Sequence, residues 1–283
     1  MIEAPRRPIL RWHGGKWILA PWIISHFPQH RCYVEPFGGA ASVLMRKQIS
    51  YTEVYNDLDG EVVSLFRVAR DHGPELREML RLTPFSRADF AESHEPGGNP
   101  IEQARRTVVR SFMGFGSNAH NRATGFRADS SRSGTTPAHD WAHYPKAFDL
   151  VIERLRGVVI ENRDGKEVMS AHDAPTTLHY VDPPYVAETR DKGPDYRFEM
   201  TDDDHAELAK FLRTLKGMVI VSGYDCPLYE NLFGDWRTER KRALADGARE
   251  RIETLWLSPN IVDSGTLGLD FSEPNKPLDT GTE

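Results

Sequence analysis

The sequence predicts an α/β protein with a mostly parallel, doubly wound sheet, a closing β-hairpin and an inserted, mainly helical subdomain. Three observations lead to this fold class. Apolar runs of strand length alternate with helical patterns over roughly the first seventy residues, and the alternation resumes after about residue 150. Between these stretches the strand patterns disappear. A chain of 283 residues has room for one such domain with an insertion.

The first stretch contains two strand–helix units. Residues 31–35 and 52–56 are predicted strands, and residues 40–47 and 59–71 are predicted helices. The second helix carries its apolar side chains at the spacing of an amphipathic helix. Strands that alternate with helices in this way are typical of a parallel sheet.

The inserted subdomain is predicted over residues 71–149. Its helical patterns cover residues 75–82 and 101–112. Residues 114–137 are rich in Gly, Ser, Thr, Asn and Arg. A loop of this length inside a compact domain is usually functional or disordered. We therefore expect a helical subdomain that carries a polar, basic loop.

After residue 150 the α/β pattern continues. Strands are predicted over 158–161, 178–182 and 218–222, helices over 203–215 and 227–233, and a hairpin over 236–244 and 251–257. Thr201 or Asp202 is placed to cap the helix that starts at residue 203. Residues 1–70 and 150–263 thus form the expected main domain. Residues 264–283 have the composition of a flexible tail.

Composition excludes several classes of protein. With 39 % apolar and 28 % charged residues, the chain can bury a sizeable core. No apolar run approaches the roughly 20 residues of a membrane-spanning helix, and the N-terminus lacks a signal-peptide apolar region. Cys32 and Cys226 are far apart and have no His or Cys neighbours at metal-ligand spacing, so neither disulfides nor a metal is expected. We expect a monomer with reduced thiols in the cytoplasm.

The arginines are unevenly distributed. The net charge of −6 argues mildly against nucleic acid. Six arginines nevertheless lie between Arg105 and Arg132, where Asp129 is the one acid. Residues 237–242 hold four more basic side chains against Glu239. A basic face for DNA or RNA is one interpretation, and a solvated, arginine-rich helix face is the other.

The strand predicted over 178–182 ends in Asp182-Pro183-Pro184-Tyr185. The carboxylate can accept a proton or an N–H bond. The prolines hold the main chain extended and leave its carbonyls free to accept. The tyrosine ring offers a flat face for stacking. Together these groups suit the binding of an exocyclic amine on an aromatic base, although a strand can also leave its sheet through such a rigid turn.

A Gly38-Gly39 turn follows the strand predicted over 31–35. Glycines in a strand-to-helix turn let the backbone approach a ligand. The next strand ends about 20 residues later at Asp57 and Asp59, where an acid can bind the hydroxyls of a ribose. A tight turn and a helix cap explain the same residues without a ligand.

The order of these motifs resembles the DNA adenine methylase family, whose members use S-adenosylmethionine to methylate the amino group of adenine in DNA. The resemblance rests on Arg11-Trp12-His13-Gly14-Gly15-Lys16, residues 33–42, Asp57, Asp182-Pro183-Pro184-Tyr185, residues 221–225 and residues 257–260. It implies a Rossmann-like class I methyltransferase fold with a target-recognition subdomain at the insertion. It also implies double-stranded DNA as the partner, in a bacterial cell or a phage-infected host.

The resemblance assigns the cofactor pocket residue by residue. Trp12 and Lys16 would help close the pocket from the N-terminal side. Glu35, Phe37 and Gly39 would lie along the methionine and sugar part of S-adenosylmethionine. Asp57 would bind the ribose hydroxyls. The family often has further glycines where this chain has Ala40-Ala41. Two added methyl groups fit if the φ angles there are negative, as a helix start requires.

The resemblance also assigns the chemistry. Asp182 would sit where the cofactor and the target amine meet. The Asp182 carboxylate and the Pro183 carbonyl would each accept one N–H of that amine, which turns its lone pair toward the sulfonium methyl. Tyr185 would stack on the target base. No covalent enzyme intermediate is needed.

An adenine inside a duplex must be flipped out before it can react. The loop over residues 111–127 is the best candidate for reading the surrounding sequence, because Asn and Arg pair with adenine and guanine edges. The residues expected to bind DNA are Asn118, Arg122 and Arg127. Phe115 or Met113 would wedge into the gap that the base leaves.

Other functions stay open at this stage. An RNA adenine-N6 methyltransferase would use the same chemistry, and a catalytically idle DNA-binding protein would keep the same fold. A cytosine-N4 methyltransferase usually carries Ser in place of the first Asp of the tetrapeptide. A dinucleotide oxidoreductase would need a full Gly-x-Gly-x-x-Gly, which this turn lacks. The leading hypothesis is site-specific adenine-N6 methylation of duplex DNA.

Overall fold

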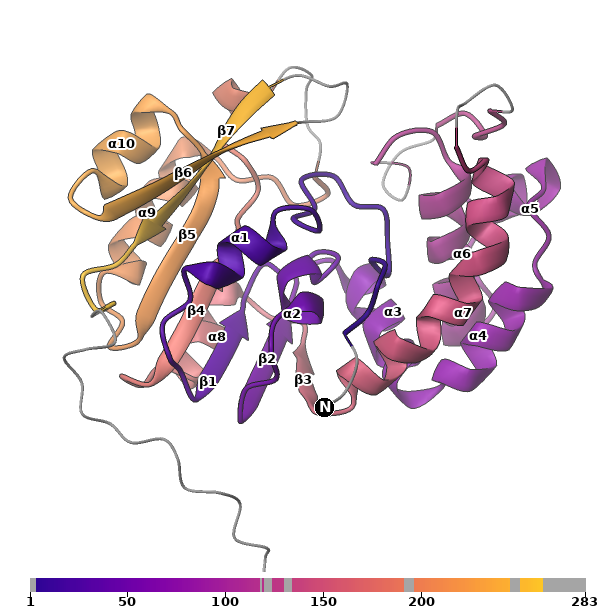
Figure 1. Ribbon diagram of the computed structural model, residues 1–283, viewed down its shortest axis with the longest axis horizontal. Helices are drawn as coiled ribbons and strands as arrows, with labels where there is room; N and C mark the ends of the chain where they lie inside the picture. Colours follow the sequence, from indigo (N-terminus) through magenta and orange to yellow (C-terminus); the bar gives the residue numbers. More distant parts are fainter. Residues whose placement is uncertain are drawn as a thin grey trace, which may run out of the picture.

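The computed structural model has a central sheet with helices on both faces (Figure 1). It describes residues 4–117, 119, 124–129, 134–190, 196–244 and 250–261. Over these residues the strand order is β3-β2-β1-β4-β5-β7-β6. Strands β3, β2, β1, β4 and β5 pair in parallel, and β7 is antiparallel to both of its neighbours. The predicted mostly parallel sheet with a closing hairpin is confirmed.

The first and last residues of each predicted strand lie within two residues of those observed in the structure. The parallel strands are β1 (Cys32–Glu35), β2 (Thr52–Asn56), β3 (Val158–Glu161), β4 (Thr177–Val181) and β5 (Met218–Tyr224). The hairpin consists of β6 (Arg237–Leu244) and β7 (Glu250–Leu257). The side chains of β4 are all buried, as expected for a parallel strand that helices cover on both faces.

Two apolar cores lie on opposite faces of the sheet. Helices α1 (Ala20–Ser25), α2 (Ser42–Arg46) and α3 (Gly60–Asp71) cover one face, and α8 (Gly165–Ala171), α9 (Asp202–Leu212) and α10 (Pro227–Phe233) cover the other. Tyr33 belongs to the first core and its neighbour Val34 to the second, because successive strand residues point to opposite faces. Thr201 caps α9 in a reciprocal capping box with Asp204.

The insertion between β2 and β3 is helical, as expected. It comprises α4 (Gly73–Leu82), α5 (Arg87–Glu92), α6 (Pro100–Met113) and α7 (Pro137–Leu155), which stand beside the β3 edge of the sheet in Figure 1. Helices α4, α6 and α7 pack against α3 and share its apolar core. Helix α7 runs past the expected boundary at residue 149. No helix within the described ranges combines the length and apolar composition that a membrane span requires.

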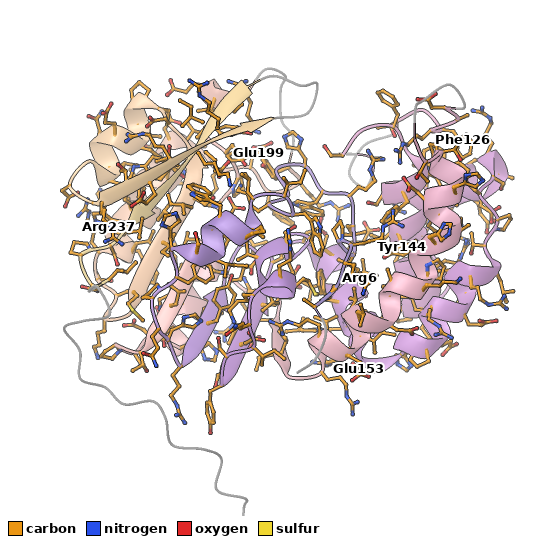
Figure 2. The ribbon with its side chains drawn as sticks, in the orientation of Figure 1. Arg6, Phe126, Tyr144, Glu153, Glu199 and Arg237 are labelled. Atoms are coloured by element: carbon orange, nitrogen blue, oxygen red, sulfur yellow. The ribbon has the colours of Figure 1, made fainter. Side chains whose placement is uncertain are left out.

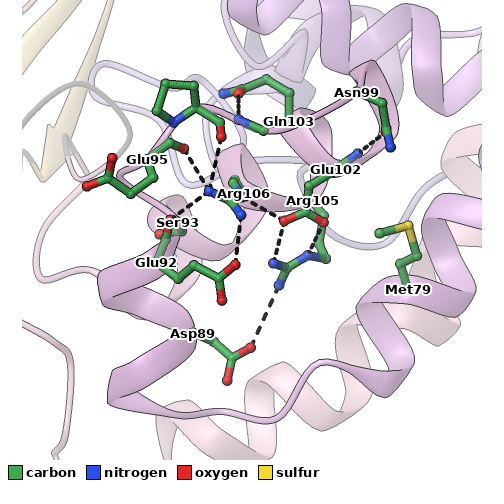
Figure 3. A network of polar contacts seen from close by, with 12 residues as sticks. Met79, Asp89, Glu92, Ser93, Glu95, Asn99, Glu102, Gln103, Arg105 and Arg106 are labelled. Carbon is green, nitrogen blue, oxygen red and sulfur yellow. Dashed lines mark hydrogen bonds and ion pairs between the residues drawn. The ribbon is translucent and has the colours of Figure 1, made fainter.

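The arginines at the start of α6 are buried in ion pairs. Arg105 and Arg106 donate to the Glu102 carboxylate through Nε, at 2.7 and 2.6 Å. Arg106 also donates to the main-chain carbonyls of Glu92 and Glu95, each at 3.0 Å (Figure 3). These contacts tie α6 to the segment that follows α5.

A third arginine of α6 joins the insertion to the sheet domain. Arg110 is buried and binds both the Glu61 carboxylate of α3 and the Ser93 carbonyl. The arginines at 105, 106 and 110 therefore hold helices together. Both interpretations of them, as a nucleic-acid face and as a solvated helix face, were wrong. Their sequence spacing could not reveal this, because Glu61 and Ser93 come from other elements.

A further buried ion pair holds the end of α7 against the sheet. Arg154 donates to Glu53 of β2 at 2.5 and 2.9 Å and to the Leu44 carbonyl at 2.7 Å. Lys47 binds the same carboxylate. The side chains of Arg154 and Glu53 are 3 % and 2 % exposed, so water cannot replace either partner.

We expect Arg154→Leu to lower the free energy of unfolding by about 3 kcal/mol, because the buried Glu53 carboxylate loses one of its two cations. Urea denaturation followed by circular dichroism measures this loss. Arg156→Leu is the matched control: Arg156 pairs with Glu153 at 3.3 Å and its side chain is 70 % exposed. Its removal should cost less than about 1 kcal/mol. Equal losses in the two variants would contradict the role given to Arg154.

Candidate functional site

A cavity of about 280 Å³ lies at the carboxyl ends of β1 and β4. The chain order reverses between these two neighbouring strands, and ligands of open α/β sheets bind at such a point. The cavity is lined by all seven residues expected to bind the cofactor: Trp12, Lys16, Glu35, Phe37, Gly39, Asp57 and Asp182. Motif residues from distant parts of the sequence thus line one cavity.

The glycines of the turn after β1 are required by close packing. A Cβ atom at Gly38 would lie 2.2 Å from the Tyr55 ring. At Gly39, where φ is +47°, a Cβ would lie 2.6 Å from Trp12 Nε1. Tyr55 also donates its hydroxyl to the Gly39 carbonyl at 2.8 Å. The turn is therefore fixed against β2 and against the N-terminal segment.

The condition of negative φ, under which two added methyl groups after this turn would fit, is not met at Ala41. Ala41 has φ 52° and ψ 37°, the left-handed conformation, and it caps α2. Its N–H donates to the Gly38 carbonyl at 2.7 Å, so the chain makes a second reversal before the helix begins. A left-handed conformation costs a non-glycine residue roughly 1–2 kcal/mol. Because Ala41 is fully buried, its methyl group packs in the core.

Asp57 and Asp59 have different roles. The Asp59 carboxylate caps α3 by accepting from the Glu61 N–H at 3.0 Å. The Asp57 carboxylate accepts from the N–H groups of Gly39 and Asp59, each at 2.8 Å, and faces the cavity. Burial raises the pKa of Asp57 to about 6, and these two N–H bonds limit the rise. The helix-cap interpretation holds for Asp59 and not for Asp57.

Glu35 places a second carboxyl group on the cavity wall, and this one is buried. Its Oε2 accepts from the Tyr33 hydroxyl at 2.7 Å and from the Leu44 N–H at 3.0 Å. Burial raises the pKa of Glu35 to about 8, and the negative charge of Asp182 adds to the rise. Glu35 therefore carries a proton at neutral pH until a cation approaches it.

Lys16 joins the N-terminal segment to the end of β4. Its Nζ donates to Asp182 Oδ1 at 2.8 Å and to the Tyr185 hydroxyl at 2.6 Å, and it lies 3.3 Å from Glu253 Oε1 on β7. The Lys16 side chain is 3 % exposed. Burial alone would lower the pKa of Lys16, but the carboxylates of Asp182 and Glu253 raise it well above its usual value. Ser222 supports Glu253 with a hydrogen bond of 2.8 Å.

Asp182 and the two prolines line the cavity, whereas Tyr185 lies behind it. The Tyr185 ring is buried and stacks on Tyr224 of β5, with ring centroids 4.3 Å apart and planes 12° apart. Burial raises the pKa of Asp182, and Lys16 opposes this rise. The structure therefore brings a carboxylate, two prolines and a stacked aromatic pair to one strand end.

The sequence did not identify two groups of residues at the site: the segment 196–200 and Glu253. Residues 196–200 also line the cavity, and Figure 2 labels Glu199 in this segment. Arg197 donates to Asp59 Oδ1 at 2.8 Å and to Glu61 Oε2 at 3.1 Å. Glu253 was also missed. Arg197 binds residues about 135 or more positions away in the chain, and Glu253 lies in a hairpin that carries no recognisable motif. Local sequence patterns therefore could not identify either residue.

Of the three residues predicted to bind DNA, the structure describes only Arg127. Asn118 and Arg122 lie outside the described residues. Arg127 donates its backbone N–H to the Met113 carbonyl at 2.7 Å, and Gly114 and Phe126 form an isolated antiparallel bridge. Phe126, labelled in Figure 2, packs on the rings of Phe85 and Phe90, which fixes this return strand to the insertion.

The two wedge candidates differ in exposure. Phe115 is 72 % exposed, and its N–H donates to the Gly125 carbonyl at 2.8 Å. Met113 is fully buried in the apolar core, so it cannot enter a duplex. Only Phe115 remains a candidate for the wedge.

Comparisons with known proteins agree with the geometry. Residues 12–245 match the family described as D12 class N6 adenine-specific DNA methyltransferase. The chain is 36 % identical over 75 residues to DNA adenine methylase from Escherichia coli, covering 26 % of this chain and 27 % of that protein. It is 32 % identical over 65 residues to the enzyme of that name from Haemophilus influenzae, covering 23 % of this chain and 22 % of that protein.

A longer match has lower identity. The chain is 24 % identical over 237 residues to Type II methyltransferase M.MjaIII from Methanocaldococcus jannaschii, covering 74 % of this chain and 80 % of that protein. The matches to the DNA adenine methylases span only about a quarter of those proteins.

The raised pKa of Glu35 predicts a pH dependence of stability. The unfolded chain releases this proton near pH 4.5 and the folded protein near pH 8, so the folded state loses stability as pH rises between these values. Between pH 6.5 and 7.5 the free energy of unfolding should fall by up to about 1.4 kcal/mol more than in Glu35→Gln. Urea denaturation at both pH values measures this difference. Identical slopes in the two proteins would show that Glu35 is ionised in the folded state.

Proposed function

Because the chain belongs to the D12 class N6 adenine-specific DNA methyltransferase family, we propose that it methylates the exocyclic N6 of adenine in double-stranded DNA. The observation that carries the proposal is the placement of Asp182 and Pro183 at the end of β4, on the wall of the switch-point cavity. We propose S-adenosylmethionine as the methyl donor and a monomer as the working unit.

The residues around the cavity fit S-adenosylmethionine. Two carboxyl groups, buried Glu35 and half-buried Asp57, suit the ammonium group and the ribose hydroxyls of this molecule. Phe37 offers an aromatic surface on the same wall. Gly38 and Gly39 line the cavity without side chains, because a Cβ atom at either position would collide with an aromatic neighbour. Their backbone can therefore approach a ligand closely. When bound, the cofactor supplies an electrophilic sulfonium methyl group.

The chain's own residues would activate the amine. The N6 lone pair of adenine is delocalised into the ring, which makes it a poor nucleophile. If the Asp182 carboxylate and the Pro183 carbonyl each accept one N–H, the lone pair turns out of the ring plane. Lys16 holds Asp182 at Oδ1. Asp182 would then take the proton that N6 loses as the N–C bond forms and the methyl–sulfur bond of the donor breaks, which leaves the donor as a neutral thioether. Positioning and electrostatics provide most of the rate enhancement.

The target adenine would reach this site by leaving the duplex. We propose that the insertion reads the surrounding sequence, with Asn118, Arg122 and Arg127 at base edges or phosphates and exposed Phe115 in the vacated stack. The anchoring of Phe126 supports this proposal, because it holds the base of the loop rigid.

We expect Asp182→Ala to reduce methyl transfer to duplex DNA at least about 100-fold, because the amine loses its carboxylate acceptor. Cofactor affinity should change little. Thermal stability should fall, because buried Lys16 then keeps only Glu253 as a carboxylate partner, so circular dichroism must first show that the variant is folded. Incorporation of labelled methyl groups into duplex DNA and into structured RNA measures the effect and separates the RNA alternative. Asp235→Asn, an exposed acid paired with Arg213, is the control. Turnover by Asp182→Ala at the wild-type rate would rule out this active site.

Cofactor binding should release a proton from Glu35. At pH 7 the free protein holds this proton, and the ammonium group of S-adenosylmethionine favours the ionised carboxylate. Calorimetric binding enthalpies in buffers with different ionisation enthalpies count the protons released. Wild type should release up to about one proton more than Glu35→Gln. The same proton count in both proteins would mean that Glu35 does not meet the ammonium group.

A further inference from the structure

We propose that Tyr224 is the second aromatic wall of the target-base site, and that the flipped adenine enters between the rings of Tyr185 and Tyr224. This inference rests on the proposed function and deepens it. In the free protein the two rings close on each other, so Tyr224 occupies the place that the base takes during the reaction.

The stacking geometry leaves Tyr185 no free face. Its ring is 6 % exposed, and Tyr224 lies parallel to it at a centroid distance of 4.3 Å. A planar base cannot stack on Tyr185 unless one of the two rings moves, because close-packed rings leave no space between them. The role given to Tyr185 therefore requires an opening between these rings.

Tyr224 is the ring that can move. The Tyr185 hydroxyl is bound to buried Lys16, and a Cβ added to Gly14 would lie 3.0 Å from the Tyr185 ring, so the segment before Lys16 packs closely on it. Tyr196 contacts Tyr185 edge-on, with centroids 6.5 Å apart. Tyr224 is only half-buried and is the last residue of β5. It can turn away from the sheet without breaking the strand.

A second cavity, of about 560 Å³, gives Tyr224 room to turn and gives the base a route. It is lined by Tyr224 together with residues of the hairpin and of the segments after β4 and β5. Tyr185 lies between Tyr196, on the cofactor cavity, and Tyr224, on the second cavity. Asp182, which lines the cofactor cavity, lies three residues before Tyr185 at the same strand end.

The charges around the second cavity suit a nucleic-acid strand. Arg242 and Arg251 line it from β6 and β7, and the Arg251 guanidinium lies 5.6 Å from the Tyr224 ring centroid. Two acids, Glu188 and Asp225, also line it, and Asp225 binds Arg240 of β6 at 3.0 Å. Two arginines beside a movable ring match the phosphates that flank a flipped nucleotide.

The test compares methylation kinetics of Tyr224→Ala, Tyr224→Phe and wild type. The substrate is a duplex with the target context found by sequencing DNA from an expressing host that lacks adenine methylation. Tyr224→Ala should lower kcat/KM about tenfold or more, since one stacking partner of the base is lost. Tyr224→Phe keeps the ring and should stay within about threefold of wild type. Affinity for S-adenosylmethionine should be unchanged in both, because Tyr224 does not line the cofactor cavity.

A second substrate separates a role in base binding from a structural one. Placing an abasic site opposite the target adenine lowers the cost of flipping. At saturating DNA the kcat defect of Tyr224→Ala should therefore shrink several-fold on this duplex, because the base is then flipped in most bound complexes even without the second ring. Tyr51→Ala, an exposed aromatic at the start of β2, should behave as wild type on both duplexes.

Two results would overturn the proposal: wild-type kinetics in Tyr224→Ala, or a defect of the same size on both duplexes. Failure of the proposed function itself looks different, because wild type would then methylate neither duplex.

Discussion

The buried contact between Lys16 and Asp182 is the interaction on which the rest of the site depends. It joins residues 166 positions apart and brings together three elements: the N-terminal segment, the end of β4 and, through Glu253, the closing hairpin. A buried lysine with two carboxylates is stable only while all three remain in place. The same contact places Lys16 against the Tyr185 hydroxyl. The contacts that join these three elements therefore also position Asp182 and Tyr185 in the site.

The sheet topology explains why the motifs converge. Strands β1 and β4 are neighbours although about 140 residues separate them, so the glycine turn after one faces the carboxylate after the other. Asp57 reaches the same cavity from β2 by binding the Gly39 N–H. The helical insertion leaves this arrangement intact, since it enters and leaves at the β3 edge. The buried arginines of α6 fix the insertion to α3, which gives the loop after α6 a rigid base.

The sequence predicted what is local in the chain and missed what depends on contacts between distant residues. The strands and the glycine turn follow from apolar patterning and from short motifs, and the structure confirms them. The ion pair of Arg110 with Glu61, the salt bridges of Arg197 and the position of Glu253 arise only when separate elements meet. The left-handed conformation of Ala41 was not predicted, because alanine at the start of a helix usually has a negative φ. Tyr224 lies within residues 221–225, one of the motifs behind the resemblance, but its stacking on Tyr185 was not predicted, because it arises only when β4 and β5 pair.

The central claim is that this site delivers a methyl group to the N6 of adenine in duplex DNA. The most direct measurement is mass spectrometry of nucleosides from duplex DNA incubated with the protein and isotopically labelled S-adenosylmethionine. The account predicts labelled N6-methyldeoxyadenosine, with no label on cytosine. Label on cytosine N4, or label found in structured RNA and absent from duplex DNA, would contradict the account.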